Sequence, residues 1–503
     1  MQHQNSHSAS EAASVVIVGG GTAGWMAAAF LARMGHKSFS ITLVEADSIA
    51  TVGVGEATIP SIQLFNQLLG IDEKQFLAAT HGSIKLGIEF QNWGKQQHRY
   101  LHAFGGIGID VGLLDFYQYW LRARQQGDTS SLWDYALNAE AANQKKFAPV
   151  ERVGDTRLTG LRYAYHFDAS RYAQFLRRYA ENLGVVRQEG VIRQVRQTDD
   201  GSIASVVLES GREVAGDLFI DCSGFAALLI EKTLATGFDD WSHYLPCNRA
   251  IAVPSENTGE INPYTRSIAH TAGWQWHIPL QHRAGNGHVF CSDFISEDEA
   301  TALLLNNLPS KPLAEPRTIR FTTGVRKKSW HKNCVALGLS SGFLEPLEST
   351  SIALVQHGLE LLVKYFPGKK VCQPDVDEFN RHMRREYEMV RDFIILHYHL
   401  TERDDTPFWQ HCRTMVVPER IVKKVELFKT HGRVVRDHNE LFGEMAWLQV
   451  MLGQGVMPQA YHPLANRIAA DELRELLMHT GALVKATVDS MPQHRDYLSA
   501  AGH

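Results

Sequence analysis

Two short apolar runs near the N-terminus predict the first strands of the chain. Residues 15–18 (VVIV) are continuously apolar and β-branched, as a strand buried on both faces of a sheet is, and residues 41–45 (ITLVE) predict a second buried strand that ends in Glu45. Between them, residues 25–35 (WMAAAFLARMG) have the composition of a helix that ends at its final glycine. The order strand, helix, strand predicts an α/β unit built on a parallel sheet.

A stretch of alternating residues, GSIKLGIEFQNW (82–93), predicts another strand. A period of two places Ile84, Leu86, Ile88 and Phe90 on one face and Lys85, Gly87, Glu89 and Gln91 on the other. Because lysines are rarely buried, the pattern alone favours a solvated Lys85 on a half-exposed strand. The alternative is that Lys85 uses the space left by the neighbouring glycine for a function.

The stretch GWQWHIPL (273–280) predicts a strand with an aromatic face. Alternation puts Trp274, Trp276 and Ile278 on one side and Gln275, His277 and Pro279 on the other. An aromatic strand face usually belongs to the core. The alternative is that the tryptophans border a site for a flat aromatic molecule.

Residues 336–366 predict a strand, a turn and a helix. Pro346 with Ser349 or Thr350 signals the helix start, and the helix then carries apolar residues at Ile352, Leu354, Val355, Leu359 and Leu362. Glu348 and Ser349 are therefore expected at a helix N-terminus, where free N–H groups favour an anion. Two interpretations stay open: ordinary capping by Glu348, or a halide site made from the N–H groups.

A glycine fingerprint joins the first strand to the first helix. Gly19, Gly21 and Gly24 have the Gly-x-Gly-x-x-Gly spacing, and Glu45 follows Gly24 by 21 residues at the end of the second strand. In this context the first glycine permits a tight turn, the second lets the backbone approach a pyrophosphate, and the third lets helix pack on strand. Glu45 is expected to bind a ribose hydroxyl. A tight turn without a ligand is the less favoured alternative.

Two later segments favour FAD over NAD as the dinucleotide. TVGVGEATIP (51–60) contains Gly53, Gly55, Glu56 and Pro60 in a loop suited to lie against a flat ring, and DLFIDCSGF (217–225) runs from a strand into a turn of small residues. Since the sequence has no second complete fingerprint for NADPH, we expect reducing equivalents to come from outside the chain.

Composition narrows the remaining classes. At 503 residues and 44% apolar content, the chain is expected to form two to four structural units with a large core. The net charge of −5, without a Lys/Arg run, argues against nucleic acid, and no apolar run is long enough for a membrane span. Six scattered cysteines favour reduced thiols in a cytoplasmic protein, and no protein-bound metal is expected. The polar segment 1–13 predicts a flexible tail.

Taken together, these motifs resemble the flavin-dependent tryptophan halogenase family. The resemblance is carried by GGGTAG (19–24), GVGEATIP (53–60), the lysine of GSIKLG, WQWHIP (274–279), GFLEPLESTSIALVQ (342–356) and HYHLTERDDTPFW (397–409). It implies that reduced FAD, supplied by a separate NAD(P)H-dependent flavin reductase, uses dioxygen to oxidise bromide or chloride to hypohalous acid. The acid then halogenates an electron-rich aromatic substrate held away from the flavin.

The resemblance also implies roles for individual residues. Lys85 matches the catalytic lysine, which hydrogen-bonds the hypohalous acid or forms a haloamine, and Glu348 matches the glutamate that assists it and accepts the ring proton. Thr350 and Ser351 match the halide-binding positions, although the family often has glycine at the second. The expected FAD-site residues are Gly19, Gly21, Thr22, Ala23, Gly24, Glu45, Gly55, Glu56, Ala57 and Gly338. The motif Trp274, Trp276, Ile278 and Pro279 is expected near the flavin, where it keeps organic substrate away.

The implied substrate site is formed by His102, Phe104, Ser349 and Trp447. Tryptophan halogenases bind the amino and carboxylate groups of their substrate with tyrosines and a glutamate shortly before the last of these positions. The corresponding stretch here, GRVVRDHNELFGEMAW (432–447), has no tyrosine. This departure favours a smaller indole, or an indole within a larger molecule, over free tryptophan.

The expected architecture is an α/β, FAD-binding fold of the glutathione-reductase type with an interleaved substrate-binding sheet and a mainly helical C-terminal region. We expect the FAD-binding unit in 14–230, with substrate-side insertions in 85–170, and its return segment in 320–365. The substrate-side sheet is expected in 231–319 and the helical region in 366–503. Two further functions stay open: a flavin monooxygenase that hydroxylates an aromatic substrate, and a non-catalytic flavoprotein.

Overall fold

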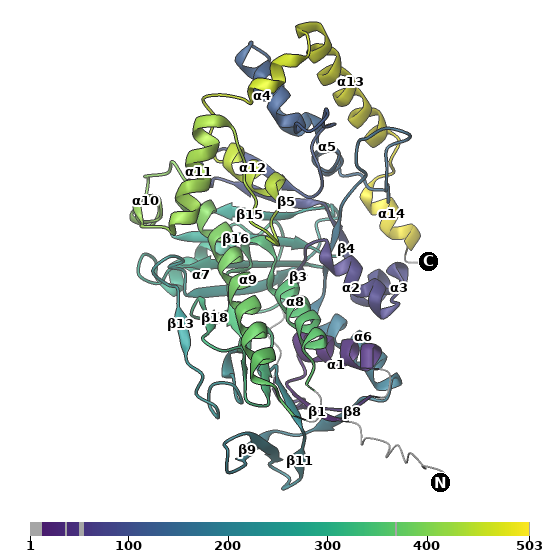
Figure 1. The fold of residues 1–503 in the computed structure, drawn as a ribbon, viewed down its shortest axis with the longest axis vertical. Helices are drawn as coiled ribbons and strands as arrows, with labels where there is room; N and C mark the ends of the chain where they lie inside the picture. Colours follow the sequence, from purple (N-terminus) through teal and green to yellow (C-terminus); the bar gives the residue numbers. More distant parts are fainter. Residues whose placement is uncertain (1–12, 36–37, 50–54, 368–369, 502–503) are drawn as a thin grey trace, which may run out of the picture.

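The computed structural model describes residues 13–35, 38–49, 55–367 and 370–501. The expected tail, apart from residue 13, and Gly53 lie outside these residues. The described chain forms a mainly parallel sheet at one end of the long axis, a larger mixed sheet in the middle and a group of helices at the other end (Figure 1).

A six-stranded sheet contains the first two predicted strands. Its strands, in order, are β20 (Trp330–His331), β21 (Cys334–Ala336), β12 (Leu218–Asp221), β1 (Ala13–Val18), β2 (Phe39–Glu45) and β8 (Val186–Glu189). All neighbours run parallel except β20 and β21. Val15 pairs with Ile41 in β1 and β2, so the predicted strand–helix–strand unit is confirmed. Parallel order brings the carboxyl ends of β1, β2 and β12 to one edge, where α1 (Thr22–Gly35) begins.

A seven-stranded sheet occupies the middle of the molecule. Its strands, in order, are β18 (Arg317–Arg320), β14 (Arg249–Ser255), β17 (Ala284–Phe290), β16 (Gly273–Pro279), β15 (Thr265–Ala269), β5 (Gly87–Gln91) and β6 (Arg99–Ala103). Only β15 and β5 are parallel neighbours. Strand β16, which carries the Trp-x-Trp motif, is buried along its whole length. Both of its faces are therefore packed, one of them by aromatic side chains.

Three small sheets complete the β-structure of the described residues. They consist of β3 (Glu56–Ala57), β7 (Ala164–Phe167) and β4 (Ser83–Lys85); β11 (Glu213–Ala215), β10 (Ile203–Leu208) and β9 (Ile192–Gln197); and β13 (Phe238–Asp240), β19 (Gly324–Arg326) and β22 (Gly342–Phe343). Strands β3 and β4 both pair with β7, which brings Lys85, at the end of β4, close to Thr58, the residue after β3.

The prediction of one strand over residues 82–93 is wrong. Strands β4 and β5 belong to different sheets, and Leu86 lies at the break between them. The Leu86 N–H donates to Pro263 O at 2.7 Å, and its carbonyl accepts from the Phe104 N–H at 2.8 Å. The interpretation of Lys85 as a solvated residue is wrong too, because its side chain is 0% exposed. Its amine is enclosed by residues from other parts of the chain, among them Thr58 and Ser349.

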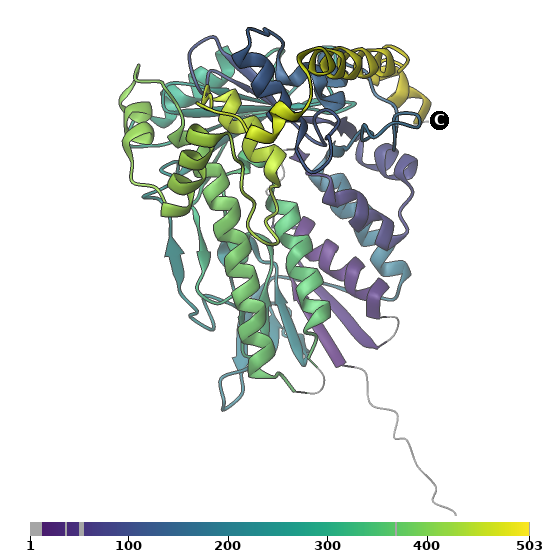
Figure 2. The same ribbon diagram turned by 45° about the horizontal axis from the view of Figure 1, so that its top comes forward.

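The helices cover the sheets and fill the end of the molecule opposite β1. They are α1, α2 (Ser61–Leu69), α3 (Glu73–Thr80), α4 (Phe116–Gln125), α5 (Leu137–Asn143), α6 (Ala169–Asn182), α7 (Glu297–Asn306), α8 (Ser351–Lys364), α9 (Gln373–His399), α10 (Pro407–Thr414), α11 (Glu419–His431), α12 (Glu444–Gly453), α13 (Ala470–Asp489) and α14 (His494–Ala501). Figure 2 shows α8 and α9 side by side in front of the sheets. In the described part of the chain, no helix is long and apolar enough to span a bilayer.

Candidate active site

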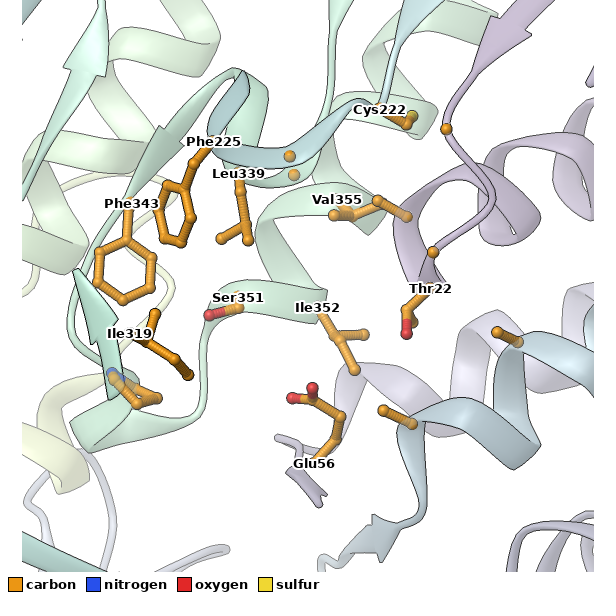
Figure 3. A pocket seen from close by; sticks show the side chains of 18 of the residues that line it. Thr22, Glu56, Cys222, Phe225, Ile319, Leu339, Phe343, Ser351, Ile352 and Val355 are labelled. Atoms are coloured by element: carbon orange, nitrogen blue, oxygen red, sulfur yellow. The ribbon is translucent and has the colours of Figure 1, made fainter. Parts of the chain in front are cut away.

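A cavity of about 640 Å³ lies at the carboxyl ends of β1, β2 and β12 (Figure 3). Its lining includes nine of the ten predicted FAD-site residues: Gly19, Gly21, Thr22, Ala23, Glu45, Gly55, Glu56, Ala57 and Gly338. The tenth, Gly24, lies inside α1 and packs the helix against the first turn. The turn Cys222–Ala226 and the start of α8 close other sides of the cavity.

The glycines make this cavity possible in the way the fingerprint predicts. Gly19 has a φ of +110°, and a Cβ at this position would lie 2.2 Å from Cys222 O. A Cβ on Gly24 would lie 1.8 Å from Gly19 O, so helix, turn and strand can meet only without side chains. The N-terminus of α1 then borders the cavity with unpaired N–H groups, as pyrophosphate binding requires. These residues fit FAD.

Two glutamates, Glu45 and Glu56, line the cavity in different surroundings. Glu45, at the end of β2, accepts a hydrogen bond from Arg187 Nε at 2.6 Å. Glu56 points into the cavity (Figure 3), and burial together with the nearby Asp168 raises its pKa to about 7. A glutamate of this kind carries a proton for much of the time at neutral pH.

Lys85 is anchored beside the cavity by two hydrogen bonds and lies next to an aromatic ring. Its Nζ donates hydrogen bonds to Ser349 Oγ at 2.7 Å and to Thr58 O at 2.9 Å, and it lies 5.4 Å from the centre of the Phe104 ring. Burial lowers the pKa of Lys85 to about 7, while the charge of Glu348 opposes the shift. Since Ser349 lines the cavity, the amine lies just beyond its wall.

Glu348 is held by two histidines instead of by Lys85. His102 Nδ1 lies 3.0 and 2.9 Å from the two carboxylate oxygens, and His397 Nε2 lies 2.8 Å from Oε1. Burial alone would raise the pKa of Glu348, but these histidines outweigh it and lower the value to about 2. The carboxylate is therefore ionised at every working pH.

His397 is a site residue that the sequence interpretation did not name. It lies near the end of α9, and its Nδ1 is 2.8 Å from Phe393 O. One ring nitrogen thus faces a backbone carbonyl, and the other lies within ion-pair distance of the Glu348 carboxylate. The signal available in the sequence was a histidine one helical turn after Phe393, on the apolar face of α9.

Helix α8 starts where the sequence predicts, with Thr350 at the N-cap, but a separate turn precedes it. Pro346–Glu348 forms a 3-10 turn, Ser349 has a left-handed φ of 59°, and α8 begins at Ser351. Glu348 does not cap the helix, because its carboxylate binds the histidines; the capping interpretation is wrong. The Thr350 and Ser351 N–H groups have no acceptor among the described residues, and Ser351 lines the cavity (Figure 3).

The Trp-x-Trp motif borders the cavity and also contacts Glu345, the residue before the turn Pro346–Glu348. Trp274, Trp276 and Ile278 line the cavity from one face of β16, as the alternation predicts. Trp274 Nε1 donates to Glu345 Oε2 at 2.9 Å, and the same oxygen accepts from the Tyr398 hydroxyl at 2.5 Å. Burial raises the pKa of Glu345 to about 7.

The other end of the motif is tied to the segment that carries Lys85. Pro279 does not line the cavity; its carbonyl accepts from Ser83 Oγ in β4 at 2.6 Å. Strand β16 is thus hydrogen-bonded both to the turn before Glu348 and to the strand that ends at Lys85.

Two of the other predicted substrate residues, His102 and Trp447, belong to an aromatic cluster centred on Phe393. His102 and Trp447 are buried around Phe393, at ring-centre distances of 5.7 and 5.3 Å. Phe442 stacks on Phe393 at 4.0 Å. None of His102, Phe104 and Trp447 lines the cavity, whereas Lys85 contacts both Ser349 on the cavity wall and the Phe104 ring. Their contact with an arene stays a prediction.

Comparisons with known proteins agree with this geometry. A family model described as tryptophan halogenase matches residues 14–470. Tryptophan 6-halogenase ThaL of Streptomyces albogriseolus is 36% identical to the chain and covers 96% of it, with 98% of ThaL matched.

Two solved structures share the whole fold. A flavin-dependent halogenase from Xanthomonas campestris is 46% identical, with a TM-score of 0.94 and coverage of 97% of this chain and 98% of that one. The halogenase BrvH from Brevundimonas sp. BAL3 is 45% identical, with a TM-score of 0.94 and coverage of 97% and 99%. Both are described as flavin-dependent halogenases, without a stated substrate.

Proposed function

Since the chain belongs to the tryptophan halogenase family of flavin-dependent enzymes, we propose that it halogenates an electron-rich arene, most favourably an indole, with bromide or chloride. The observation that carries this proposal is the position of Lys85. Its amine is fully buried, has a pKa lowered to about 7, and lies between the nucleotide cavity and the aromatic cluster. We infer that an oxidant passing from the cavity to the cluster meets this amine.

The nucleotide cavity is the proposed FAD site. The N-terminal turn of α1 would bind the pyrophosphate and Glu45 a ribose hydroxyl. Reduced FAD, when bound, supplies the dioxygen chemistry that oxidises halide to hypohalous acid. A separate NAD(P)H-dependent flavin reductase is the proposed source of reduced FAD, in keeping with the single dinucleotide fingerprint of the sequence.

The halide is proposed to bind at the N-terminus of α8. The Thr350 and Ser351 N–H groups precede or begin the helix, where the helix dipole favours an anion. The side chain of Ser351 occupies space that glycine leaves open, so it narrows this part of the cavity.

Lys85 has one position on its nitrogen free for chemistry in either protonation state. Two N–H groups are committed to Ser349 and Thr58. The ammonium keeps a third N–H that can hydrogen-bond hypohalous acid, while the neutral amine keeps a lone pair that can form a haloamine. Because the pKa is about 7, both forms are present at neutral pH.

Glu348 is the proposed acceptor for the proton that the ring loses. Its low pKa makes it a weak base, but a halogenated arenium ion is a strong acid and needs no stronger one. The same ionised carboxylate stabilises positive charge on the ring. His102 and His397 keep it ionised and fix its orientation.

The proposal is tested by incubating the protein with FAD, a flavin reductase, NADH, bromide and indole, followed by mass spectrometry. The expected product is a bromoindole, recognised by the bromine isotope pair, and its formation should require bromide. A hydroxylated indole formed without halide would instead identify a monooxygenase. Bound flavin without any turned-over arene would identify a non-catalytic flavoprotein.

A further inference from the structure

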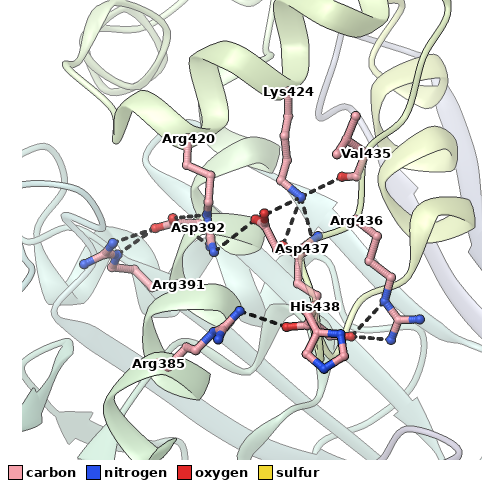
Figure 4. Close-up of polar contacts among 10 residues, drawn as sticks. Arg385, Arg391, Asp392, Arg420, Lys424, Val435, Arg436, Asp437 and His438 are labelled. Atoms are coloured by element: carbon pink, nitrogen blue, oxygen red, sulfur yellow. Dashed lines mark hydrogen bonds and ion pairs between the residues drawn. The ribbon is translucent and has the colours of Figure 1, made fainter. Parts of the chain in front are cut away.

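The segment 432–443, between α11 and α12, is fixed by a buried ion pair (Figure 4). Lys424 Nζ, from α11, lies 2.8 Å from Glu440 Oε2 and also donates to Val435 O at 2.7 Å. The Lys424 and Glu440 side chains are only 7% and 2% exposed. Asp437 adds a second carboxylate at 3.6 Å from the same ammonium.

The arginines that contact this segment are also committed to partners. Arg436 donates to Glu440 O at 2.6 Å and Arg385 to His438 O at 2.8 Å. Arg420 pairs with Asp392 at 2.9 Å, and its second contact, to Asp437, is 3.6 Å. The charges of Lys424, Arg385, Arg420 and Arg436 are therefore matched by carboxylates and carbonyls of the protein itself.

The ion pair is in direct contact with the aromatic cluster. Lys424 Nζ lies 4.5 Å from the centre of the Trp447 ring, and Glu440 is two residues before Phe442. Trp447 and Phe442 both pack on Phe393, which neighbours His102 and His397. Lys424 and Lys85 thus each lie over an aromatic ring of the proposed arene site. The Trp447 Nε1–H is buried and has no acceptor among the described residues.

We propose that the Lys424–Glu440 pair is a specificity device that restricts the site to uncharged arenes. This inference rests on the proposed function, because it takes the aromatic cluster as the arene site. A carboxylate on the substrate would have to be desolvated beside Trp447, which is costly unless a cation pairs with it. Lys424 is the cation at that place, and Glu440 already neutralises it.

The charge of Glu440 can be removed with little change of shape. In Glu440→Gln, Lys424 loses its main partner and becomes available to a ligand carboxylate. The matched control is Glu419→Gln, which removes a carboxylate from the exposed pair with Lys423 on the same helix, at 79% and 69% exposure. The double variant Lys424→Met/Glu440→Gln removes both charges and leaves no cation to be recruited.

The test measures binding of indole and indole-3-propionate by calorimetry, independently of turnover. The wild type is expected to bind indole in preference, and Glu440→Gln to raise the affinity for indole-3-propionate relative to indole by about 10-fold, the strength of a hydrogen bond to a charged group. Glu419→Gln and the double variant should keep the wild-type ratio. The same ratio in Glu440→Gln and wild type would overturn the proposal, as would an equal gain in the double variant.

Two further measurements keep the result decisive. If Glu440→Gln does not fold, as judged by circular dichroism, Asp437→Asn takes its place and is expected to shift the same ratio about 3-fold, because its contact to Lys424 is longer. An unchanged ratio in that variant would then overturn the proposal. A wild type that brominates no arene would refute the proposed function, whereas the binding ratio would still decide the role of the ion pair.

Discussion

Lys85 Nζ donates a hydrogen bond to Ser349 Oγ at 2.7 Å, and not to the carboxylate of Glu348, the preceding residue. Glu348 is bound by His102 and His397. The lysine and the glutamate expected to act together therefore belong to separate hydrogen-bonded groups that meet at one turn. Ser349, with its left-handed backbone, is the link between them.

Ser349→Ala should slow halogenation by misplacing Lys85. The variant removes one of the two hydrogen bonds that orient the amine, and a loss of about 10-fold in kcat is expected for a hydrogen bond to a partly charged group. FAD affinity, measured by flavin fluorescence, should stay close to that of the wild type. An unchanged kcat would mean that Thr58 O alone positions the amine.

The buried amine should make stability depend on pH in a defined window. Lys85 has a pKa of about 7 in the folded protein against an ordinary value of 10.5, so between these values the unfolded chain binds more protons. The free energy of unfolding of the wild type, relative to Lys85→Met, should therefore rise with pH by about 1.4 kcal/mol per unit within this window. The comparison is made by urea unfolding at about pH 7, 8 and 9, in the lower part of the window, with about pH 6 as a reference below it. A difference that does not change with pH would contradict the lowered pKa.

Glu348→Gln should abolish most of the activity without loss of flavin. The amide cannot accept the ring proton or stabilise a cationic ring, and the expected fall in kcat is about 100- to 1,000-fold. FAD binding is the control, since Glu348 does not line the nucleotide cavity. Retention of near wild-type kcat would remove Glu348 from the chemistry.

His397→Phe tests how the charge of Glu348 is maintained. Losing one of the two histidines should raise the pKa of Glu348 above about 2, so the acid limb of the kcat profile should move to higher pH, from below the measured range in the wild type into that range. The profile is measured from about pH 4 upward. A uniform fall in kcat with an unmoved acid limb would assign His397 a packing role only.

The two motif tryptophans should differ in their contribution to stability. Trp274→Phe removes the donor to Glu345, whereas Trp276 Nε1 has no acceptor among the described residues. Both substitutions remove similar volume, so Trp274→Phe should cost about 1–3 kcal/mol more than Trp276→Phe in urea unfolding. Equal costs would show that the bond to Glu345 contributes nothing.

Local patterns in the sequence predicted the strand–turn–helix unit that borders the cavity. The glycine spacing and the apolar runs on either side of α1 determine a strand–turn–helix unit through contacts between neighbouring residues. The alternation of residues 274–278 likewise placed Trp274, Trp276 and Ile278 on one face, and that face lines the cavity. In both cases the structure depends on residues that are close together in the sequence.

Features that depend on distant parts of the chain could not be predicted in this way. The break at Leu86 exists because Pro263 and Phe104 pair with its backbone, and the burial of Lys85 depends on Ser349, 264 residues away. The interaction of His397 with Glu348 requires α9 to pack against the turn before α8. An alternating pattern carries no information about these partners.

The most direct test of the central claim compares wild type with Lys85→Ala in the bromination of indole. Both proteins receive FAD, a flavin reductase, NADH and bromide, and bromoindole is quantified by its isotope pair; Lys423→Ala, which alters an exposed lysine of α11, serves as the control. The proposed role of Lys85 predicts equal FAD binding in all three proteins, full activity in the control and a loss of bromoindole of about 100-fold or more in Lys85→Ala. The same rate and the same bromoindole isomers in Lys85→Ala and wild type would contradict it, because freely diffusing hypobromous acid would then be the halogenating agent.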